Sequence, residues 1–409
     1  MLKSLIYRFL ERRHYWRYVD FEELARLYTS RTLRMLAVSM VSIFTVVYLY
    51  QNGYTFVFIM CYLVAYFLLR AIVQFPSAFL VARIGPKHVT LISNILYVPA
   101  LVSITMLPKY GIVALAIFGI FQAISSSLYE ISYLINFSKV KKDGHAGKEL
   151  GFMYMLERIA AGASPLIGGM IAFLFGPQAT MITAAILFGL AALPLLYSPE
   201  PTRTRQQISF RGLNWKLARK GLIAHMAIGA DVIASGALWS LFIAISIFGT
   251  SSNAIYAQLG ALASVTIVAS LLFAHLYGVF IDRRRGGELL RFGVIVTSLV
   301  HIARIFISTP VGVVMTNVTN ESATAAYAMP FTKGMFDVAD TLSGFRIVYI
   351  TLMCVSGTLG AALFAGTLAL LALFLPVIMT MQIGFTIAAV VVLLIMRHGF
   401  PALTTRRFF

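Results

Sequence analysis

The chain has 409 residues and a formal net charge of +18, with 59% hydrophobic and only 12% charged residues. A soluble globular protein is nearer half apolar and a quarter charged, so this composition excludes a water-soluble protein and indicates that lipid is the main solvent. A membrane-spanning helix needs about 20 apolar residues, so this length has room for roughly a dozen such helices. Both cysteines, Cys61 and Cys354, fall in apolar stretches, where we expect buried thiols without a disulfide or a metal site.

The positive charge follows the connections between apolar stretches and does not form a nucleic-acid surface. The basic segments are 1–34, 139–148, 203–220 and 283–291. The turns between them, near Asn52 and Ser251, carry almost no basic residues. This alternation is the positive-inside pattern of membrane proteins. It predicts cytosolic termini, contacts with anionic lipids at the cytosolic face, and no nucleic-acid partner.

The elements follow in chain order. Residues 1–32 predict an amphipathic helix at the cytosolic membrane interface and lack the form of a cleavable signal peptide. The rest predicts an all-α membrane protein with twelve spans in two pseudo-symmetric six-helix bundles. We expect these spans near 33–50, 55–81, 89–107, 111–136, 152–175, 179–197, 221–248, 254–280, 292–308, 310–329, 346–368 and 372–395. The corresponding domains are bundles over 33–198 and 221–396, a cytosolic linker at 199–220, and a cytosolic tail at 397–409.

The tenth predicted span is unusually polar. It contains Asn317, Asn320 and Glu321, whose spacing of three and four residues places them on one helical face. A polar packing seam between helices is one interpretation, and the wall of a substrate cavity is the preferred one. A carboxylate at position 321 could take up a proton if burial raises its pKa.

The two halves repeat one another at three places, in the same order and about 190 to 200 residues apart. The matching segments are 78–85 with 278–283, Tyr133–Lys139 with Tyr327–Lys333, and Ser164–Gly169 with Ser356–Ala361. Three ordered matches predict that the second half arose by duplication of the first.

These features resemble the major facilitator superfamily of secondary transporters over nearly the whole chain after residue 33. The most specific residues lie in the turns after the second and eighth spans, where the family has Gly-x-x-x-Asp-Arg followed by basic residues. The turns here contain Arg83, Gly85 and Lys87, and Gly278, Asp282 and Arg283. The resemblance implies a cytosolic gate that latches the two bundles, with Asp282 more important because Ala82 stands where the first copy would have an aspartate.

Two further patterns resemble subgroups of this family. The fifth span resembles the antiporter pattern, and it contains Gly151, Ser164, Pro165, Gly168 and Gly169. This resemblance implies export, although small residues also pack membrane helices generally. The fourth span resembles another family pattern at Leu115 and Gln122, but Gly119 stands where the family has an arginine that is associated with proton coupling.

Ionisable side chains within spans are costly to hold and are therefore candidate functional residues. Arg70 and Gln74 lie one turn apart in the second span, and Glu130 lies near the cytosolic end of the fourth. We expect Arg70 to pair with Glu130 and to supply the positive charge that is missing at Gly119. A purely structural ion pair is the alternative.

The second half contributes its own ionisable residues. Asp231 lies about two turns inside the seventh span and is a second candidate proton acceptor, and Trp239 could stack on a substrate or simply pack. In the ninth span, His301 and Arg304 are also intramembrane, and either Glu321 or Asp231 could be the partner of Arg304. The resemblance implies that the first, fourth, seventh and tenth helices line a central cavity.

The sequence contains no nucleotide-binding loop, zinc-ligand cluster or nucleophile elbow, so we expect no enzyme activity, no cofactor and no metal. We predict a monomeric secondary transporter of the plasma membrane that moves a small molecule by alternating access, coupled to protons, with efflux favoured. An uptake permease for a sugar, nucleoside or amino acid is an alternative. A lipid flippase and a non-transporting scaffold on the same fold are two others.

Overall fold

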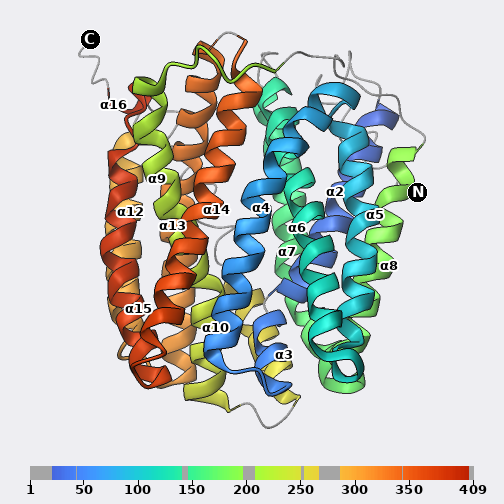
Figure 1. Cartoon of the computed structure of the whole chain (residues 1–409), viewed down its shortest axis with the longest axis vertical. Helices are drawn as coiled ribbons and strands as arrows, with labels where there is room; N and C mark the ends of the chain where they lie inside the picture. The colour runs from blue at the N-terminus through green and yellow to red at the C-terminus, as the bar shows by residue number, and fades with distance from the viewer. Residues whose placement is uncertain are drawn as a thin grey trace.

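The computed structural model of the chain describes residues 21–42, 44–140, 146–196, 208–249, 253–266, 286–342 and 344–404, and within them every regular element is helical (Figure 1). The elements before the linker are α2 (Phe21–Ser42), α3 (Thr45–Gln51), α4 (Phe56–Ile84), α5 (Pro86–Thr105), α6 (Leu107–Val140), α7 (Ala146–Phe175) and α8 (Pro177–Leu196). After it come α9 (Trp215–Ile233), η1 (Ala234–Leu238), α10 (Trp239–Ile243), η2 (Ala244–Phe248), the helix Ala254–Thr266, α12 (Gly286–Arg304), α13 (Pro310–Thr341), α14 (Arg346–Leu371), α15 (Val377–Val392), η3 (Leu393–Arg397) and α16 (Pro401–Thr404). The predicted all-helical class is confirmed.

Within the described residues, nine helical segments are long and apolar enough to cross a membrane. Two more apolar helices, Ile159–Phe175 and Ala254–Thr266, are shorter in the described part of the chain. The polar α13 is not among these segments, but it is a continuous helix that begins at Pro310, as the sequence predicts for the tenth span. The count of twelve spans and the orientation of the termini stay predictions.

The first predicted boundary is not a break in the structure. Residue 32, where an interfacial helix was expected to end, lies inside α2, which continues without interruption to Ser42. Only residues 21–32 of that expected segment are described. The gate residues Gly278, Asp282 and Arg283 lie outside the described residues.

The helices pack in two sets that lie side by side in Figure 1. We call α2 to α8 the amino-terminal group, and the helices from α9 to η3 the carboxyl-terminal group. Within the first group α5 packs on α6 and α8, and α2 packs on α7 and α8; within the second, α14 packs on α9 and α12 packs on α13. The groups meet where α4 packs along α14, and again at the lower end of Figure 1, where α3 contacts α10.

The predicted internal repeat corresponds to a repeated helix contact. Gly168 of α7 faces α2 so closely that an added Cβ would lie 2.9 Å from the Met40 carbonyl oxygen. Gly360 of α14, its counterpart in the repeat, faces α9, and an added Cβ would overlap the Met226 carbonyl oxygen. Equivalent glycines therefore make equivalent contacts in the two groups, which supports the duplication.

The small residues predicted in the fifth span also pack across the two groups. An added Cβ at Gly169 would overlap the Tyr256 carbonyl oxygen, and one at Gly260 would overlap the Pro165 carbonyl oxygen. Ser164 turns its hydroxyl back onto the Ala160 carbonyl oxygen of its own helix, at 2.8 Å. The surroundings of Gly151 lie outside the described side chains. This segment has a packing role, and its link to export stays a prediction.

One expectation about the cysteines was wrong. Cys354 is buried, but Cys61 is exposed on α4. The position of a residue within an apolar stretch does not predict burial in a membrane protein, because the outer face of a spanning helix is also apolar and contacts lipid. Large exposed side chains such as Phe175 and Phe374 belong to the same kind of surface.

Candidate functional site

Several ionisable residues within the described helices form two clusters, one in each helix group. The amino-terminal cluster consists of Arg70, Gln74 and Glu130. The carboxyl-terminal cluster consists of Asp231, Ser235, His301, Arg304 and Tyr327, with Trp239, Asn317 and Asn320 joined to it. Both clusters lie within helices, so rigid backbone elements position every side chain.

In the amino-terminal cluster, Arg70 and Glu130 form the predicted ion pair. Arg70 Nη2 lies 2.7 Å from Glu130 Oε2, and the side chains are 15% and 31% exposed. The pair joins α4 to α6, and Ser127 of α6 donates its hydroxyl to the Arg70 carbonyl oxygen at 3.3 Å. The Arg70 guanidinium also lies 5.7 Å from the ring centres of Tyr66 and Phe67. The ion pair is only partly buried.

Gln74 connects this ion pair to the opposite helix group. It is fully buried, and its Nε2 donates to Glu130 Oε2 at 2.9 Å. Its Oε1 accepts a hydrogen bond from the Thr358 hydroxyl of α14 at 3.2 Å. A single amide therefore links the carboxylate of α6 to a helix of the carboxyl-terminal group.

The carboxyl-terminal cluster centres on Asp231, which is 2% exposed. Its Oδ1 lies 2.8 Å from His301 Nε2 and accepts the Ser235 hydroxyl at 3.1 Å. The Tyr327 hydroxyl donates to its Oδ2. Three helices, α9, α12 and α13, thus converge on one carboxylate, and burial of a charge is tolerable only with such satisfaction of its oxygens.

Arg304 occupies the other side of this cluster and is 1% exposed. Its Nη1 donates to the Ser235 hydroxyl at 3.1 Å and lies 3.1 Å from His301 Nδ1. The guanidinium lies 4.9 Å from the Trp239 ring centre. The partner that the sequence left open is therefore the Asp231 network, reached through Ser235 and His301.

The polar face of α13 meets the seventh predicted span. Trp239 Nε1 donates to Asn317 Oδ1 at 2.6 Å, and Asn320 Nδ2 donates to the Ser235 hydroxyl at 3.4 Å. Glu321 follows on the same helix and is half-buried. The π-helical turns η1 and η2 flank α10 on either side of these contacts, and such turns often occur at functional sites.

Sequence reasoning missed the place of His301 and Tyr327 in this cluster. Tyr327 was noted only as a marker of the internal repeat. A buried aspartate needs several hydrogen-bond donors, and Arg304 was the only partner that the sequence suggested for Asp231.

The other predicted residues lie apart from both clusters. Gln122 donates its Nε2 to the Tyr97 hydroxyl at 3.0 Å, between α6 and α5. Gly85 forms the turn between α4 and α5 with a φ of 92°, a conformation that favours glycine. Arg83 is exposed at the end of α4.

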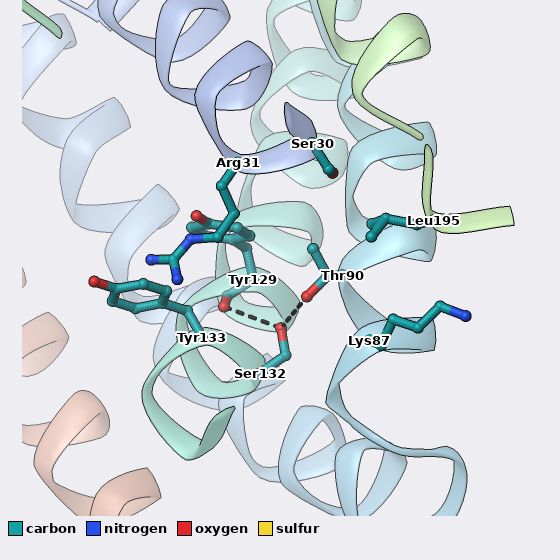
Figure 2. Close-up of a pocket in the computed structure, with 8 residues that line it drawn as sticks. All are labelled: Ser30, Arg31, Lys87, Thr90, Tyr129, Ser132, Tyr133 and Leu195. Carbon is teal, nitrogen blue, oxygen red and sulfur yellow. Dashed lines mark hydrogen bonds between the residues drawn. The ribbon is translucent and has the colours of Figure 1, made fainter. Parts of the chain in front are cut away.

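Lys87, the third described gate residue, lies at the start of α5 and lines a small pocket (Figure 2). The pocket wall is formed by Ser30, Arg31, Lys87, Thr90, Tyr129, Ser132, Tyr133 and Leu195. The Arg31 guanidinium lies 4.0 Å from the Tyr133 ring centre, and the Ser132 hydroxyl lies 3.0 Å from that of Thr90. The described gate residues therefore lie at the end of α4 and the start of α5, whereas Arg70 lies near the middle of α4.

Comparison with known proteins places this geometry in a family. The chain matches the family described as the Major Facilitator Superfamily over residues 27–338. No curated protein sequence matches the chain.

Solved structures with the same fold include a POT family transporter in complex with a thioalcohol-conjugated peptide, at 14% identity and a TM-score of 0.74, covering 93% of this chain and 96% of that one. The nucleoside transporter NupG is similar at 13% identity and a TM-score of 0.67, covering 94% of this chain and 100% of that one. The family match spans well over half of the residues, and the helical fold agrees with it. The chain therefore belongs to the Major Facilitator Superfamily, a family of secondary transporters.

Proposed function

We propose that the chain is a secondary active transporter that moves a small molecule across the plasma membrane by alternating access, driven by protons and in the direction of efflux. The observation that carries the proposal is the path Glu130–Gln74–Thr358, because it joins an intramembrane ion pair to the opposite helix group. In alternating access one helix group rocks against the other around a central site. A bond that crosses between the groups must break in that motion.

Protonation of Glu130 would act directly on this path. A neutral carboxyl group holds Arg70 and Gln74 less strongly than a carboxylate, because bonds to ionised groups are roughly twice as strong as those between neutral ones. Once its bond to Glu130 weakens, the bond from Thr358 is the other hydrogen bond of the Gln74 side chain within the described residues. A proton on one residue thereby changes the contact between the two helix groups, as a proton-driven cycle requires.

Contacts at the other end of the helices must open in the alternate state. The Tyr256 hydroxyl donates to Gln51 Oε1, and the Phe44 and Tyr256 rings meet edge to face at 5.4 Å. Both contacts join the amino-terminal group to the helix Ala254–Thr266, near the lower end of Figure 1. The positive-inside pattern predicts that this end is extracellular.

A second candidate function is uptake of a polar solute. The peptide-bound and nucleoside transporters that share the fold give a starting panel of substrates, and 5-aminolevulinic acid, bound in another structure of a POT family transporter, extends it. The pair of clusters would suit a substrate with both a charged and an aromatic part, since each cluster places a guanidinium beside aromatic rings.

Purified protein in proteoliposomes tests these proposals. Labelled peptides, nucleosides, amino acids, sugars and lipophilic dyes, together with a fluorescent lipid, would be assayed with and without an imposed pH gradient. We expect one solute to accumulate only with the gradient, and the direction of flux to separate efflux from uptake. Movement of the lipid alone would favour a flippase instead.

Variants identify the residues that carry the flux. Glu130→Gln and Glu321→Gln remove one carboxylate each at the expected cavity, and Glu288→Gln is the matched control because Glu288 is exposed in the first turn of α12. If the unmodified protein transports neither a solute nor a lipid under any imposed gradient, the transport proposal fails, and a non-transporting scaffold is favoured.

A further inference from the structure

The carboxyl-terminal cluster contains a histidine whose hydrogen bonds define its charge. His301 is fully buried, and its two ring nitrogens face Asp231 and Arg304. A guanidinium can only donate, so the Arg304 bond requires His301 Nδ1 to be an unprotonated acceptor. The proton of the neutral ring is then on Nε2, which donates to Asp231 Oδ1. The network assigns His301 as neutral between one negative and one positive side chain.

Every other bond in the cluster agrees with this assignment. The Ser235 hydroxyl accepts from Arg304 and gives its own proton to Asp231, and Tyr327 gives its proton to the second carboxylate oxygen. No group in the described network is left with two donors facing each other. The neighbouring helix α15 places the Phe385 ring 6.0 Å from the Arg304 guanidinium, and Glu321 of α13 lies within electrostatic range of Tyr327.

One added proton would disturb this arrangement at a single contact. The only acceptor on His301 is Nδ1, so protonation there breaks the bond from Arg304 Nη1 and leaves two donors 3.1 Å apart. The ring also gains a positive charge beside the guanidinium, while its bond to Asp231 strengthens. Arg304 must therefore move away from His301.

A movement of Arg304 would change its contact with Trp239. The guanidinium lies 4.9 Å from its ring centre, and the Arg304 Nε has no hydrogen-bond partner within the described part of the chain. Trp239 in turn holds Asn317 of α13 at 2.6 Å. A shift of Arg304 thus changes the contact that joins the seventh and tenth predicted spans.

We propose that His301 is a proton acceptor of the transport cycle and that Arg304 transmits its protonation to Trp239 and Asn317. This inference rests on the proton coupling proposed above. In the conformation described here the His301 ring is fully buried, so the proton is taken up in the alternate state, when the two helix groups have moved apart, and is held when they close. His301 is a positioning residue for the cavity wall, acting through Arg304.

Tryptophan fluorescence tests the proposal without a known substrate. The chain has three tryptophans, so Trp16→Phe with Trp215→Phe leaves Trp239 as the only reporter. We expect its emission to change with a single midpoint across about pH 5 to 8, where histidine titrates. His301→Gln should abolish the change, and Arg304→Gln should also abolish it, because no cation then moves against the ring.

Two other histidines give matched controls. His225→Gln and His398→Gln should keep the pH-dependent change, because His225 bonds the Met353 carbonyl oxygen and His398 accepts the Phe400 backbone N–H. Persistence of the fluorescence change in His301→Gln would overturn the proposal. A change that persists in His301→Gln and disappears in Asp231→Asn would identify Asp231 as the group that takes up the proton. Elution as a single species on size exclusion establishes that each variant is folded.

The outcome also separates this inference from the proposed function. A fluorescence change that follows His301, without any flux driven by a pH gradient, would leave a histidine switch in a protein that is not proton-driven. Flux driven by the gradient, without the fluorescence change, would retain the transporter and reject His301 as the acceptor.

Discussion

Gly229 of α9 and Gly357 of α14 lie so close that a Cβ added to Gly229 would overlap the carbonyl oxygen of Gly357. The same α14 also packs along α4 of the other helix group. Small residues allow membrane helices to approach this closely, and the gain is van der Waals contact along the backbone.

Gly229→Ala should therefore destabilise the fold, because the added methyl group has no room and the two helices must separate. Overpacking of this kind costs about 1–3 kcal/mol, and sometimes more. Gly189→Ala in α8 is the control, since an added Cβ there meets nothing within 4 Å. Thermal unfolding in detergent measures both variants. Equal melting temperatures for the two variants would contradict the tight contact.

Breaking the Arg70–Glu130 pair should cost more than removing both partners. Arg70→Met or Glu130→Leu alone leaves one charge without its partner, at a cost of about 1.5–3 kcal/mol for a bond to a charged group. The double variant should be more stable than either single variant, because no lone charge remains. A double-mutant cycle of thermal unfolding measures the coupling, and simple additivity of the two losses would refute a direct interaction.

Thr358→Val should loosen the contact between the two helix groups. It removes the hydroxyl that lies 3.2 Å from Gln74 Oε1 and 2.9–3.0 Å from two carbonyl oxygens of its own helix. A hydrogen bond of about 1 kcal/mol between the groups corresponds to roughly a fivefold change in an equilibrium. Cys354 is buried one turn earlier on α14 and reports the change. In a Cys61→Ser background, we expect maleimide to label it about five times faster in the variant.

Thr367→Val is the control for this experiment. Thr367 is exposed on the same helix, and its hydroxyl bonds only within that helix, to Leu363 at 2.9 Å. Faster labelling in Thr367→Val, or no difference in Thr358→Val, would argue against a latch at position 358.

His398 should make the fold less stable in acid. Burial, and then the nearby positive charge of Arg291, lower the pKa of this residue below its usual value of 6.5. The unfolded chain therefore binds the proton more readily, so stability is complete above pH 6.5 and decreases as the pH falls through that value. His398→Asn should show a smaller drop in melting temperature between neutral and mildly acidic buffer. An unchanged drop would assign the acid sensitivity to other groups.

Much of the fold could be predicted from the sequence, because hydropathy and loop charge are read directly from residue order. The helix spans follow from these two signals, and the pairing of Arg70 with Glu130 follows from the cost of leaving either charge alone in a membrane. The repeat predicted the equivalence of Gly168 and Gly360, since a duplicated group must repeat its tightest contacts.

The carboxyl-terminal cluster could not be assembled in the same way. The spacing of residues along one helix defines which of them share a face, but it does not define how α9, α12 and α13 are rotated about their axes. Those rotations bring Tyr327 and His301 onto Asp231. Similarly, the lipid-facing position of Cys61 depends on which side of α4 faces outward.

The amide of Gln74 has a further consequence for which side chains position 74 can accept. Its nitrogen donates a hydrogen bond to the Glu130 carboxylate, and its oxygen accepts one from the Thr358 hydroxyl, so the amide has a defined orientation. Glutamate at this position would set two like charges against each other, and leucine would offer neither function. Position 74 therefore requires a side chain that carries both a hydrogen-bond donor and a hydrogen-bond acceptor, as the glutamine amide does.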